Sequence, residues 1–408
     1  MRFSRILENP RNFIEILSQI DTRCLAKVEC VVACQDGKEL DVESIGKLPV
    51  CSYGALLRST EPVPNRASAD SGCIIFTTSG TTKRPKLVLH AQKGITHHAG
   101  EIAVVLGLDQ PNAALLQVIP FCGVFGFSQA VGALAGGATI VCAPEFKADD
   151  TLALIDRYGI SHLCGSDEMF ARLIDVLPNS NPFPSIAFCG FATFTPSLGN
   201  IVELADQRGL KLVGLYGASE ILAYFASQNP GDTVPNRARM GGFPVSAGAE
   251  VRVRDPEDGR LLGTDETGEL EFKGPSLMHQ YFNDKDATIT AFTEDGFFKS
   301  GDLGCLRPDG SFEFLSRMGD VLRLGGFLVN PQEIETYIQT CSEVDGCQVV
   351  GIEGPRGTRP VGFVTMQNDA RAVERDLIDH CKAGLAKYKV PFRIFYLNPI
   401  QFLKTQPS

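Results

Sequence analysis

Residues 73–86, CIIFTTSGTTKRPK, combine hydroxyl groups, a glycine and cationic side chains in a pattern suited to binding a polyphosphate. The apolar start predicts a strand that leads into a hydroxyl-rich loop. In that loop Gly80 lets backbone N–H groups approach phosphate oxygens, and Lys83, Arg84 and Lys86 supply positive charge. The hydroxyls belong to Thr77, Thr78, Ser79, Thr81 and Thr82.

This loop differs from the common nucleotide-binding loop GxxxxGK[ST]. That pattern needs a second glycine and a lysine followed by Ser or Thr, whereas here Pro85 precedes Lys86 and Leu87 follows it. Taken alone, the segment is also compatible with a simple Ser/Thr turn between a strand and the next element. The choice between a phosphate loop and a turn therefore depends on the rest of the chain.

The composition indicates a globular enzyme with a large core. The chain has 408 residues, of which 44% are hydrophobic and 21% are charged, and it contains 41 glycines. A chain of this length is expected to form roughly two or three domains. The net charge of −10 is spread along the sequence, which argues against a nucleic-acid surface and requires a local cationic cluster for any bound anion.

The cysteines and histidines show no disulfide or zinc pattern. The 13 cysteines are scattered singly from Cys24 to Cys381, so we expect reduced thiols. Neither a signal-peptide core nor a membrane-length apolar segment is present, and we expect a cytoplasmic protein that binds no membrane. His97 and His98 lie on a predicted helix and point in different directions, which disfavours a shared metal ion.

From about residue 70 to residue 225, short apolar runs alternate with amphipathic stretches, the pattern of parallel strands linked by helices. This predicts an open α/β layer with ligands at the strand ends. Strands are predicted at 113–120, 139–142, 161–164, 186–189 and 211–216. Helices are predicted at 127–134, 149–158, 167–177 and 196–208.

The pattern changes near residue 240 and again after residue 317. Short β segments at 250–254, 268–273, 304–307 and 311–315 predict a small β subdomain. A compact α+β unit is then predicted from a hairpin in LRLGGFLVN, a helix at 331–340, strands near 347–353 and 361–366, and a closing helix at 371–385. We therefore predict a large α/β domain with a mainly parallel sheet at 1–319, which includes the β subdomain, and a small α+β domain at 320–408.

Five motifs, taken in order, resemble the motif series of the adenylate-forming enzymes, which include acyl-CoA synthetases, adenylation domains and luciferases. They are TTSGTTKRPK (77–86), LYGASE (215–220), GELEFKGPSLMHQYFN (268–283), KSGDLG (299–304) and RMGDVLRLGGFLVNPQEIE (317–335). The similarity covers nearly everything from residue 72 onward and is closest to aryl- and acyl-CoA ligases. It implies that ATP and a carboxylic acid form an acyl adenylate with loss of pyrophosphate, after which a thiol takes the acyl group.

The resemblance assigns the triphosphate and its metal ion to the first two motifs. Lys86 and the loop hydroxyls would hold the β and γ phosphates, and Glu220 would bind Mg²⁺, so both are expected catalytic residues. Tyr216 is expected beside adenine and Ser219 at a phosphate, although Ser219 and Glu220 alone would also fit an ordinary helix cap. The other residues expected to contact ATP or AMP are Gly190, Phe191, Ala192 and Gly217.

The resemblance also assigns residues to the sugar, to a hinge and to the thiol. Asp302, expected in a glycine-flanked turn, would accept hydrogen bonds from both ribose hydroxyls, with Arg317 as a second contact. An ordinary turn aspartate is the alternative for Asp302. Asp320 corresponds to the hinge about which a mobile C-terminal unit rotates between the half-reactions. Gly325 and Gly326 correspond to a hairpin that leaves a channel for the thiol, or else form a plain tight hairpin.

The chain also departs from the family pattern. Lys83 stands where the family usually has glycine, and the segment of about 70 residues before the phosphate loop is shorter than in most relatives. We expect part of the N-terminal subdomain to be missing or rebuilt. The catalytic lysine of the family is expected just beyond FLKTQPS, and Lys404 lies upstream of that position. We favour a shortened sequence over an enzyme that lacks this lysine.

The residues expected to line the acid pocket are small and mostly apolar, which suits a flat aromatic or medium-length aliphatic acid without a charged tail. Cys122 stands where amino-acid-activating relatives place an aspartate, which argues against an α-amino acid. Gly123 stands where many relatives place a gate. Core packing is the alternative for each of these positions. The pocket residues are Cys122, Gly123, Val124, Phe125, Cys164, Gly165 and Gly214.

The sequence therefore predicts an acid:thiol ligase that uses ATP and Mg²⁺ and transfers its acyl group to CoA. Loading of a carrier-protein phosphopantetheine is the close alternative, because no residue separates the two acceptors. A non-catalytic nucleotide-binding relative is the second class, and the retention of Glu220, Asp302 and Arg317 argues against it. Association with a carrier protein or with a second copy of the chain stays open.

Overall fold

The computed structural model describes residues 13–21, 23, 25–26, 28–33, 44–58, 64, 66–78, 85–177, 183–195, 198–324, 327–352, 358–367 and 374–397. Contacts along the chain divide it into two units, Met1–Ser68 and Ala69–Ser408. In the part of the chain that the structure describes, every helix is too short or too polar to span a bilayer.

The first unit contains a small sheet and two short helices. Its strand order is β1-β3-β2, with β1 parallel and β2 antiparallel to β3. The second helix begins where the Ser52 hydroxyl accepts a 3.2 Å hydrogen bond from the backbone N–H of Ala55, an ordinary N-cap. The elements are α1 (Phe13–Ser18), β1 (Val31–Ala33), β2 (Ser44–Ile45), β3 (Leu48–Ser52) and α2 (Tyr53–Leu57).

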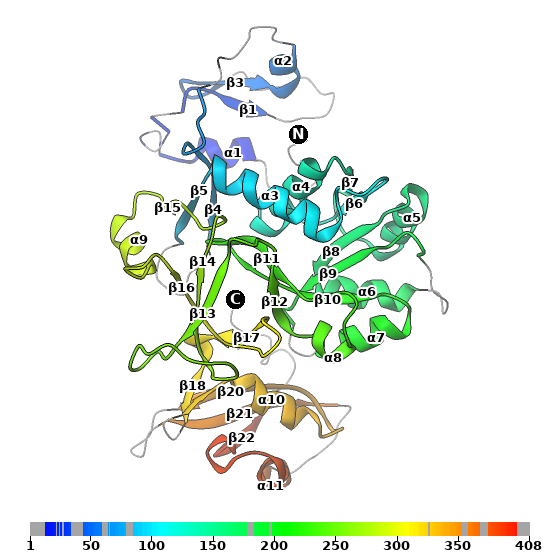
Figure 1. Ribbon diagram of the computed structural model, residues 1–408, viewed down its shortest axis with the longest axis vertical. Coiled ribbons are helices and arrows are strands. Elements are labelled where there is room, and N and C mark those ends of the chain that lie inside the picture. Colours follow the sequence, from blue (N-terminus) through cyan, green and yellow to red (C-terminus); the bar gives the residue numbers. More distant parts are fainter. Residues whose placement is uncertain are drawn as a thin grey trace. The chain divides into compact units, whose positions relative to one another are not determined.

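The second unit is built on one large sheet with the strand order β13-β14-β16-β17-β12-β11-β10-β9-β8-β6-β7 (Figure 1). The half from β10 to β7 is parallel, and the other half is antiparallel. The parallel strands are β6 (Ala114–Gln117), β7 (Thr139–Cys142), β8 (His162–Ser166), β9 (Phe188–Ala192) and β10 (Leu212–Ala218). The antiparallel strands are β11 (Leu222–Ser227), β12 (Met240–Pro244), β13 (Glu250–Arg254), β14 (Gly268–Lys273), β16 (Phe298–Leu306) and β17 (Phe312–Arg317).

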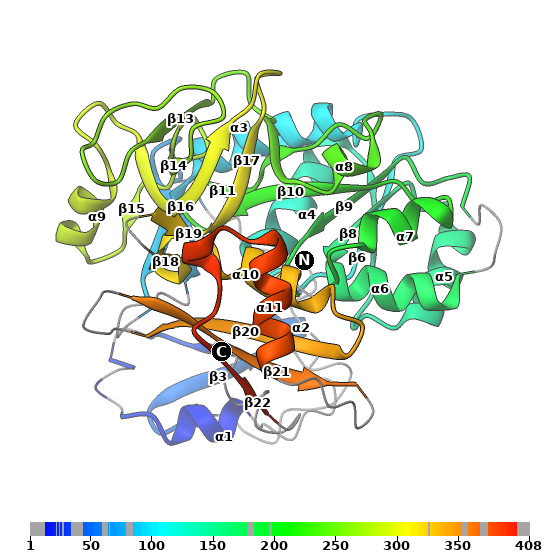
Figure 2. The same ribbon diagram turned by 90° about the horizontal axis from the view of Figure 1, so that it is seen from below.

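Helices cover both faces of the parallel half (Figure 1, Figure 2). On one face, α3 (Gln92–Leu106) and α4 (Val124–Gly136) pack on the sheet through residues such as Ile102 and Ala133. On the other face, α5 (Ala148–Tyr158), α6 (Asp167–Val176) and α7 (Ile201–Gln207) bury Ile155, Phe170 and Val202. The short α8 (Val234–Arg237) follows β11. The sheet core is therefore sealed between two helical layers, and ligands must enter at the strand ends.

A second, three-stranded sheet joins parts of the chain that are far apart in sequence. Its order is β15-β5-β4, with antiparallel pairing of Gln280 to Leu89 and of Tyr281 to Val88. This pairing places the third motif beside the strand that follows the first motif. The elements are β4 (Gly72–Thr77), β5 (Leu87–Ala91) and β15 (Gln280–Tyr281), with α9 (Lys285–Ala291) next in the chain.

The C-terminal part has a hydrophobic core of its own, in which α10 and α11 pack with a three-stranded sheet (Figure 2). Its sheet order is β20-β21-β22, with β22 parallel to β21. The elements are η2 (Met318–Asp320), β18 (Leu322–Leu324), β19 (Phe327–Val329), α10 (Pro331–Gln339), β20 (Val344–Ile352), β21 (Arg359–Met366), α11 (Glu374–Gly384), η3 (Lys387–Lys389) and β22 (Arg393–Tyr396).

The α/β fold class predicted from the sequence is confirmed, with differences in detail. The predicted strands 139–142, 250–254 and 268–273 coincide with β7, β13 and β14. The helix predicted at 196–208 is shorter, because α7 begins only at Ile201. The strands predicted for a β subdomain continue the large sheet through β12 and β17, because β11 turns back on β10 and starts an antiparallel run. The final strand β22 was not predicted.

Candidate active site

Tyr281 links Lys86 to Glu220. The ammonium nitrogen of Lys86 lies 4.7 Å from the centre of the Tyr281 ring, and the Tyr281 hydroxyl donates a 2.8 Å hydrogen bond to Oε1 of Glu220. Lys86 immediately precedes β5, whose pairing with β15 brings Tyr281 to it. The Tyr281 side chain thereby contacts both the ammonium group of Lys86 and the carboxylate of Glu220. A cation and a carboxylate in this arrangement are suited to a phosphate group with its metal ion.

Asp302 is a buried carboxylate held by residues of two other strands. The hydroxyl of Tyr216 on β10 donates a 2.5 Å hydrogen bond to its Oδ2 atom. A guanidinium nitrogen of Arg317 lies 2.8 Å from Oδ1, because Asp302 and Arg317 are paired across β16 and β17. The backbone N–H of Asp302 donates to the Ser300 hydroxyl at 3.0 Å. The carboxylate therefore has a fixed orientation.

One carboxylate oxygen of Asp302 lacks an aligned hydrogen-bond donor among the described residues. Oδ1 is buried and accepts no aligned hydrogen bond from any described residue, although Arg317 is within ion-pair distance. The pKa of Asp302 is raised to about 6, chiefly by burial and to a smaller extent by the charges of Glu220 and Glu269, while Arg317 and the Tyr216 hydrogen bond act to lower it. A hydroxyl-bearing ligand would satisfy the buried oxygen.

The turn expected at Asp302 is wrong, and the helix cap considered as the alternative for Ser219 and Glu220 is absent. Asp302 lies within strand β16 and not in a turn. The strand is irregular at this point, because Gly301 adopts φ +69° and the register of β16 on β17 shifts after Leu303. Ser219 and Glu220 do not cap a helix, because they lie in the turn between β10 and β11. Hydrogen bonding of both flanking strands into the large sheet determines these two conformations.

The turn that carries Glu220 is tight and strained. Leu222 and Tyr224 both adopt φ +64°, a left-handed conformation that costs about 1–3 kcal/mol for such side chains. A Cβ atom on Gly217 would lie 2.6 Å from Cα of Ala223, so only glycine allows this close approach. The backbone N–H of Met278 donates a 2.6 Å hydrogen bond to the carbonyl of Glu220. Packing and hydrogen bonds thus fix a conformation that the residues alone would disfavour.

Most of the predicted phosphate loop lies outside the described residues. Ser79, Gly80, Thr81 and Thr82 belong to this group, as does Lys83. Thr78 is described, and its backbone N–H donates a 3.0 Å hydrogen bond to the carbonyl of Lys86, which closes the base of the loop. The two ends of the loop therefore meet beside Tyr281.

The large sheet divides both predicted sets, because each of its sides carries some residues predicted for the acid pocket and some predicted for the nucleotide. Cys164 and Gly190 face α3 and α4, where a Cβ atom on Gly190 would lie 3.1 Å from the Cys164 sulfur. Phe191 and Gly214 face the opposite layer, and a Cβ atom on Gly214 would lie 2.0 Å from the Arg239 carbonyl. Ala192, at the end of β9, is half-buried. Alternation along a strand makes this division unavoidable.

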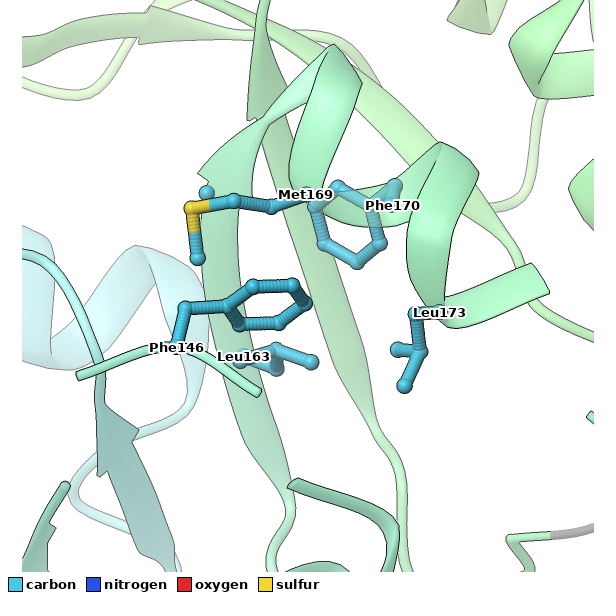
Figure 3. A pocket seen from close by; sticks show the side chains of 6 residues that line it. Phe146, Leu163, Met169, Phe170 and Leu173 are labelled. Carbon is cyan, nitrogen blue, oxygen red and sulfur yellow. The ribbon is translucent and has the colours of Figure 1, made fainter. Parts of the chain in front are cut away.

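Gly165 faces a narrow apolar pocket under α6, on the side of the sheet opposite Cys164 (Figure 3). Its Cβ position lies 3.1 Å from the terminal carbon of Met169. Figure 3 shows only carbon and sulfur atoms in the labelled side chains, which come from α6, from β8 and from the chain before α5. The labelled side chains are those of Phe146, Leu163, Met169, Phe170 and Leu173.

The remaining residues predicted for the acid pocket lie where β6 leads into α4. Cys122 is exposed, and Gly123 is the residue before the first turn of α4. Val124 and Phe125 pack against the cluster that contains Cys164, and the Phe125 ring lies 5.3 Å from that of Tyr224. The side of the sheet with Cys164 therefore brings together Val124, Phe125 and Gly190.

The residues predicted for the hinge and for the thiol channel lie after β17. Asp320 ends the short helix η2 that connects β17 to β18. Gly325 and Gly326 lie outside the described residues, although the antiparallel strands β18 and β19 on either side form the predicted hairpin. The Asn330 amide, after this hairpin, donates a 2.9 Å hydrogen bond to the Leu315 carbonyl.

Sequence reasoning missed Tyr281, although it stands within the quoted motif GELEFKGPSLMHQYFN. A tyrosine beside a strand pattern is usually a packing residue, so its type alone gave no signal. Its hydroxyl contact with Glu220 arises only from the pairing of β15 with β5. Within the described ranges, no group of three or more His, Cys, Asp or Glu side chains is placed to hold a metal ion.

Comparisons with known proteins agree with these motifs. The family model for AMP-binding enzymes matches residues 13–282, and the model of the C-terminal domain of those enzymes matches residues 333–405. Probable acyl-activating enzyme 9 of Arabidopsis thaliana is 30% identical over 340 residues, which cover 79% of this chain and 61% of that protein. The 2-succinylbenzoate–CoA ligase of Bacillus subtilis is 28% identical over 330 residues, which cover 81% of this chain and 66% of that protein.

A solved structure extends the similarity to the fold. O-succinylbenzoate coenzyme A synthetase from Bacillus subtilis, in complex with ATP and magnesium ion, shares 26% sequence identity with a TM-score of 0.74. The match covers 86% of this chain and 72% of that structure. The chain spans less than two thirds of the length of the first curated relatives, 61% in two Arabidopsis thaliana proteins.

Proposed function

The chain belongs to the adenylate-forming AMP-binding enzyme family, as its five motifs predict, and we propose that it is an ATP-dependent acid:thiol ligase. In the proposed first step a carboxylate oxygen attacks the α-phosphorus of ATP, and pyrophosphate leaves. In the second step a thiol attacks the acyl carbon, a thioester forms, and AMP leaves with the electrons of the broken C–O bond.

The observation that carries this proposal is the meeting of Lys86, Glu220 and Asp302 from three distant segments. Tyr281 joins the first two, and the hydroxyl of Tyr216, which precedes Glu220 in the same motif LYGASE, donates a hydrogen bond to Asp302. A cation, a carboxylate able to bind a metal ion and a buried hydrogen-bond acceptor match the triphosphate, the metal and the sugar of a nucleotide.

At the sugar, Asp302 would accept the hydroxyl protons. Its buried Oδ1 lacks an aligned donor among the described residues, and its Oδ2 is held by Tyr216. The neighbouring Arg317 favours the ionised carboxylate, which is the stronger acceptor. Because the Arg317 side chain is 55% exposed, it can reach the ligand from the solvent side.

At the phosphates, Lys86 would place its charge beside the β and γ groups, together with Thr78 and the loop that follows it. Glu220 would hold Mg²⁺, which when bound neutralises charge that builds up on the leaving pyrophosphate. The Tyr281 hydroxyl binds one oxygen of Glu220 and orients the other. These residues would bind and position ATP before the acid attacks.

For the acid we propose the side of the sheet with Cys164, Gly190 and Phe125, which offers apolar walls and favours an uncharged acyl chain. CoA is the proposed thiol, since relatives are named CoA ligases. The proposed domain boundary follows residue 319, with Asp320 as the hinge and Gly325 and Gly326 beside the thiol. The cytoplasm is the proposed location, on the basis of the reduced cysteines expected from the sequence.

ATP–pyrophosphate exchange over a panel of aryl and aliphatic acids tests the proposal. We expect exchange that requires both an acid and Mg²⁺, and thioester formation when CoA is added. If a phosphopantetheine carrier protein replaces CoA with higher kcat/KM, the acceptor assignment is wrong. ATP binding without exchange for any acid would instead indicate a nucleotide-binding regulatory relative.

A further inference from the structure

Two buried histidines bind the turn that carries Glu220. His90, on β5, has its Nε2 atom 2.7 Å from the carbonyl oxygen of Ser219. His98, on α3, has its Nε2 atom 2.7 Å from the carbonyl oxygen of Ala223. Their side chains are almost fully buried, with relative exposures of 0% and 1%. His90 therefore connects β5 to the turn itself, and His98 connects α3 to the start of β11 directly after the turn.

The protonation of both rings follows from their surroundings. Burial lowers the pKa of His90 and of His98 to about 4, so both rings are neutral at neutral pH. A neutral imidazole carries one N–H group, and a backbone carbonyl can only accept a hydrogen bond. The hydrogen must therefore sit on Nε2 in each ring, which makes both histidines donors to the turn.

The segment between these two contacts, which includes the turn and the start of β11, needs such support. Leu222 and Tyr224, on either side of Ala223, both have φ +64°, and bulky residues do not adopt this conformation without external restraint. The carbonyl of Glu220 is held separately by the N–H of Met278. The carbonyls of Ser219 and Glu220 in the turn and of Ala223 in β11 thus accept bonds from β5, from the segment before β15 and from α3, and Glu220 lies between the His90 and His98 contacts.

We propose that His90 is a positioning residue, which sets the direction of the Glu220 carboxylate by fixing the peptide group before it, while His98 secures the far side of the turn. This inference rests on the proposed function, in which Glu220 binds the metal ion of MgATP. His90 does not touch that ion. It acts through the backbone of Ser219, whereas Tyr281 acts on the carboxylate itself.

Isothermal titration calorimetry of ATP, with saturating Mg²⁺ and with a chelator, separates this role from general stabilisation. In His90→Leu, the gain in ATP affinity that Mg²⁺ provides should fall by about tenfold, as is typical when a residue behind a metal ligand is lost. His90→Gln should restore most of the gain, because its amide nitrogen can occupy the position of Nε2. Affinity for ATP without Mg²⁺ should stay nearly constant in both variants.

His162→Leu is the matched control. His162 is also buried and lies 2.7 Å from a backbone carbonyl, that of Leu106, in a part of the core without Glu220. This variant should lose thermal stability and keep the Mg²⁺-dependent gain in affinity. If His90→Leu does not fold, His90→Asn replaces it, because its shorter amide cannot reach Ser219, and the same loss is expected.

The outcomes distinguish this inference from the proposed function. An unchanged Mg²⁺-dependent gain in His90→Leu, or an equal loss in His90→Gln, would overturn the positioning role and leave the proposed function intact. Failure of the unmodified chain to bind ATP would reject the proposed function, and the role of His90 with it. A loss in His90→Leu that His90→Gln reverses and His162→Leu does not reproduce would support the inference.

Discussion

Tyr216 and Asp302 are 86 residues apart in the chain and are joined by a 2.5 Å hydrogen bond in the interior of the protein. The Tyr216 ring packs against Phe272 and Phe312, each at 5.3 Å between ring centres, and is only 7% exposed. Its hydroxyl therefore has a fixed position and holds one oxygen of Asp302. The structure thus gives Tyr216 a contact that the family motif did not indicate.

Substitution of Asp302 by asparagine tests the sugar contact. We expect Asp302→Asn to weaken ATP binding by about 100-fold, since two hydrogen bonds to a charged group are replaced by weaker ones. Equilibrium binding of ATP measures this effect. Asp309→Asn, which changes an aspartate in the turn between β16 and β17, is the matched control and should bind ATP normally. Normal ATP binding by Asp302→Asn would remove Asp302 from the site.

The raised pKa of Asp302 predicts opposite effects of pH on binding and on stability. ATP affinity should increase as pH rises through about 6, because the ionised carboxylate is the better acceptor. The folded state holds this proton to higher pH than the unfolded state, so the contribution of Asp302 to stability is largest at acid pH. That contribution should fall by on the order of 2 kcal/mol as pH rises from about 4 to about 7.

Chemical unfolding at several pH values measures the second effect. Asp302→Asn should be at least as stable as the unmodified chain at neutral pH, and this difference should disappear in acid. The combination of a gain in stability with a loss of ATP affinity is typical of a residue kept for function. A variant that is less stable at every pH would show that Asp302 is mainly structural.

Removal of the Tyr281 hydroxyl tests the link to Glu220. Tyr281→Phe keeps the ring beside Lys86 and loses the hydrogen bond to Glu220, so affinity for MgATP should fall by about tenfold. Affinity for ATP in the presence of a chelator should change little. Tyr158→Phe, which alters a tyrosine that is 46% exposed, is the control. Equal losses with and without Mg²⁺ would contradict a role through Glu220.

Two glycines of the predicted acid pocket should respond differently to alanine. In Gly214→Ala the new Cβ would lie 2.0 Å from the Arg239 carbonyl, and overpacking of this kind costs about 1–3 kcal/mol or more. In Gly123→Ala the nearest atom is 3.9 Å away, so stability should change by less than about 0.5 kcal/mol. Denaturant unfolding of both variants compares them. If the two variants are equally stable, Gly214 on β10 packs less closely against the Arg239 carbonyl than the distance of 2.0 Å indicates.

The sequence predicted the elements of the α/β core well, because hydrophobic periodicity is local. The predicted strand at 139–142 coincides with β7, and the predicted helix at 149–158 differs from α5 by one residue. Pairing between distant strands leaves no such local signal. The pairing of β15 with β5 and the joining of β12 to β11 were therefore missed.

The sequence named residues for the candidate site and could not give the contacts between them. The family resemblance implies Lys86, Glu220 and Asp302, whereas the Tyr281 bridge depends on a strand register that no motif encodes. The acid-pocket prediction grouped Cys164 with Gly165, although neighbouring residues of a strand face opposite sides of a sheet. Strand alternation could have separated them from the sequence alone.

A crystal structure of the chain with ATP and Mg²⁺ is the most direct test of whether Lys86, Glu220 and Asp302 bind one ATP molecule together. We expect one ATP molecule with its β and γ phosphates beside Lys86, its metal ion on Glu220 and its ribose hydroxyls on Asp302. ATP bound elsewhere, or bound with its ribose away from Asp302, would contradict it.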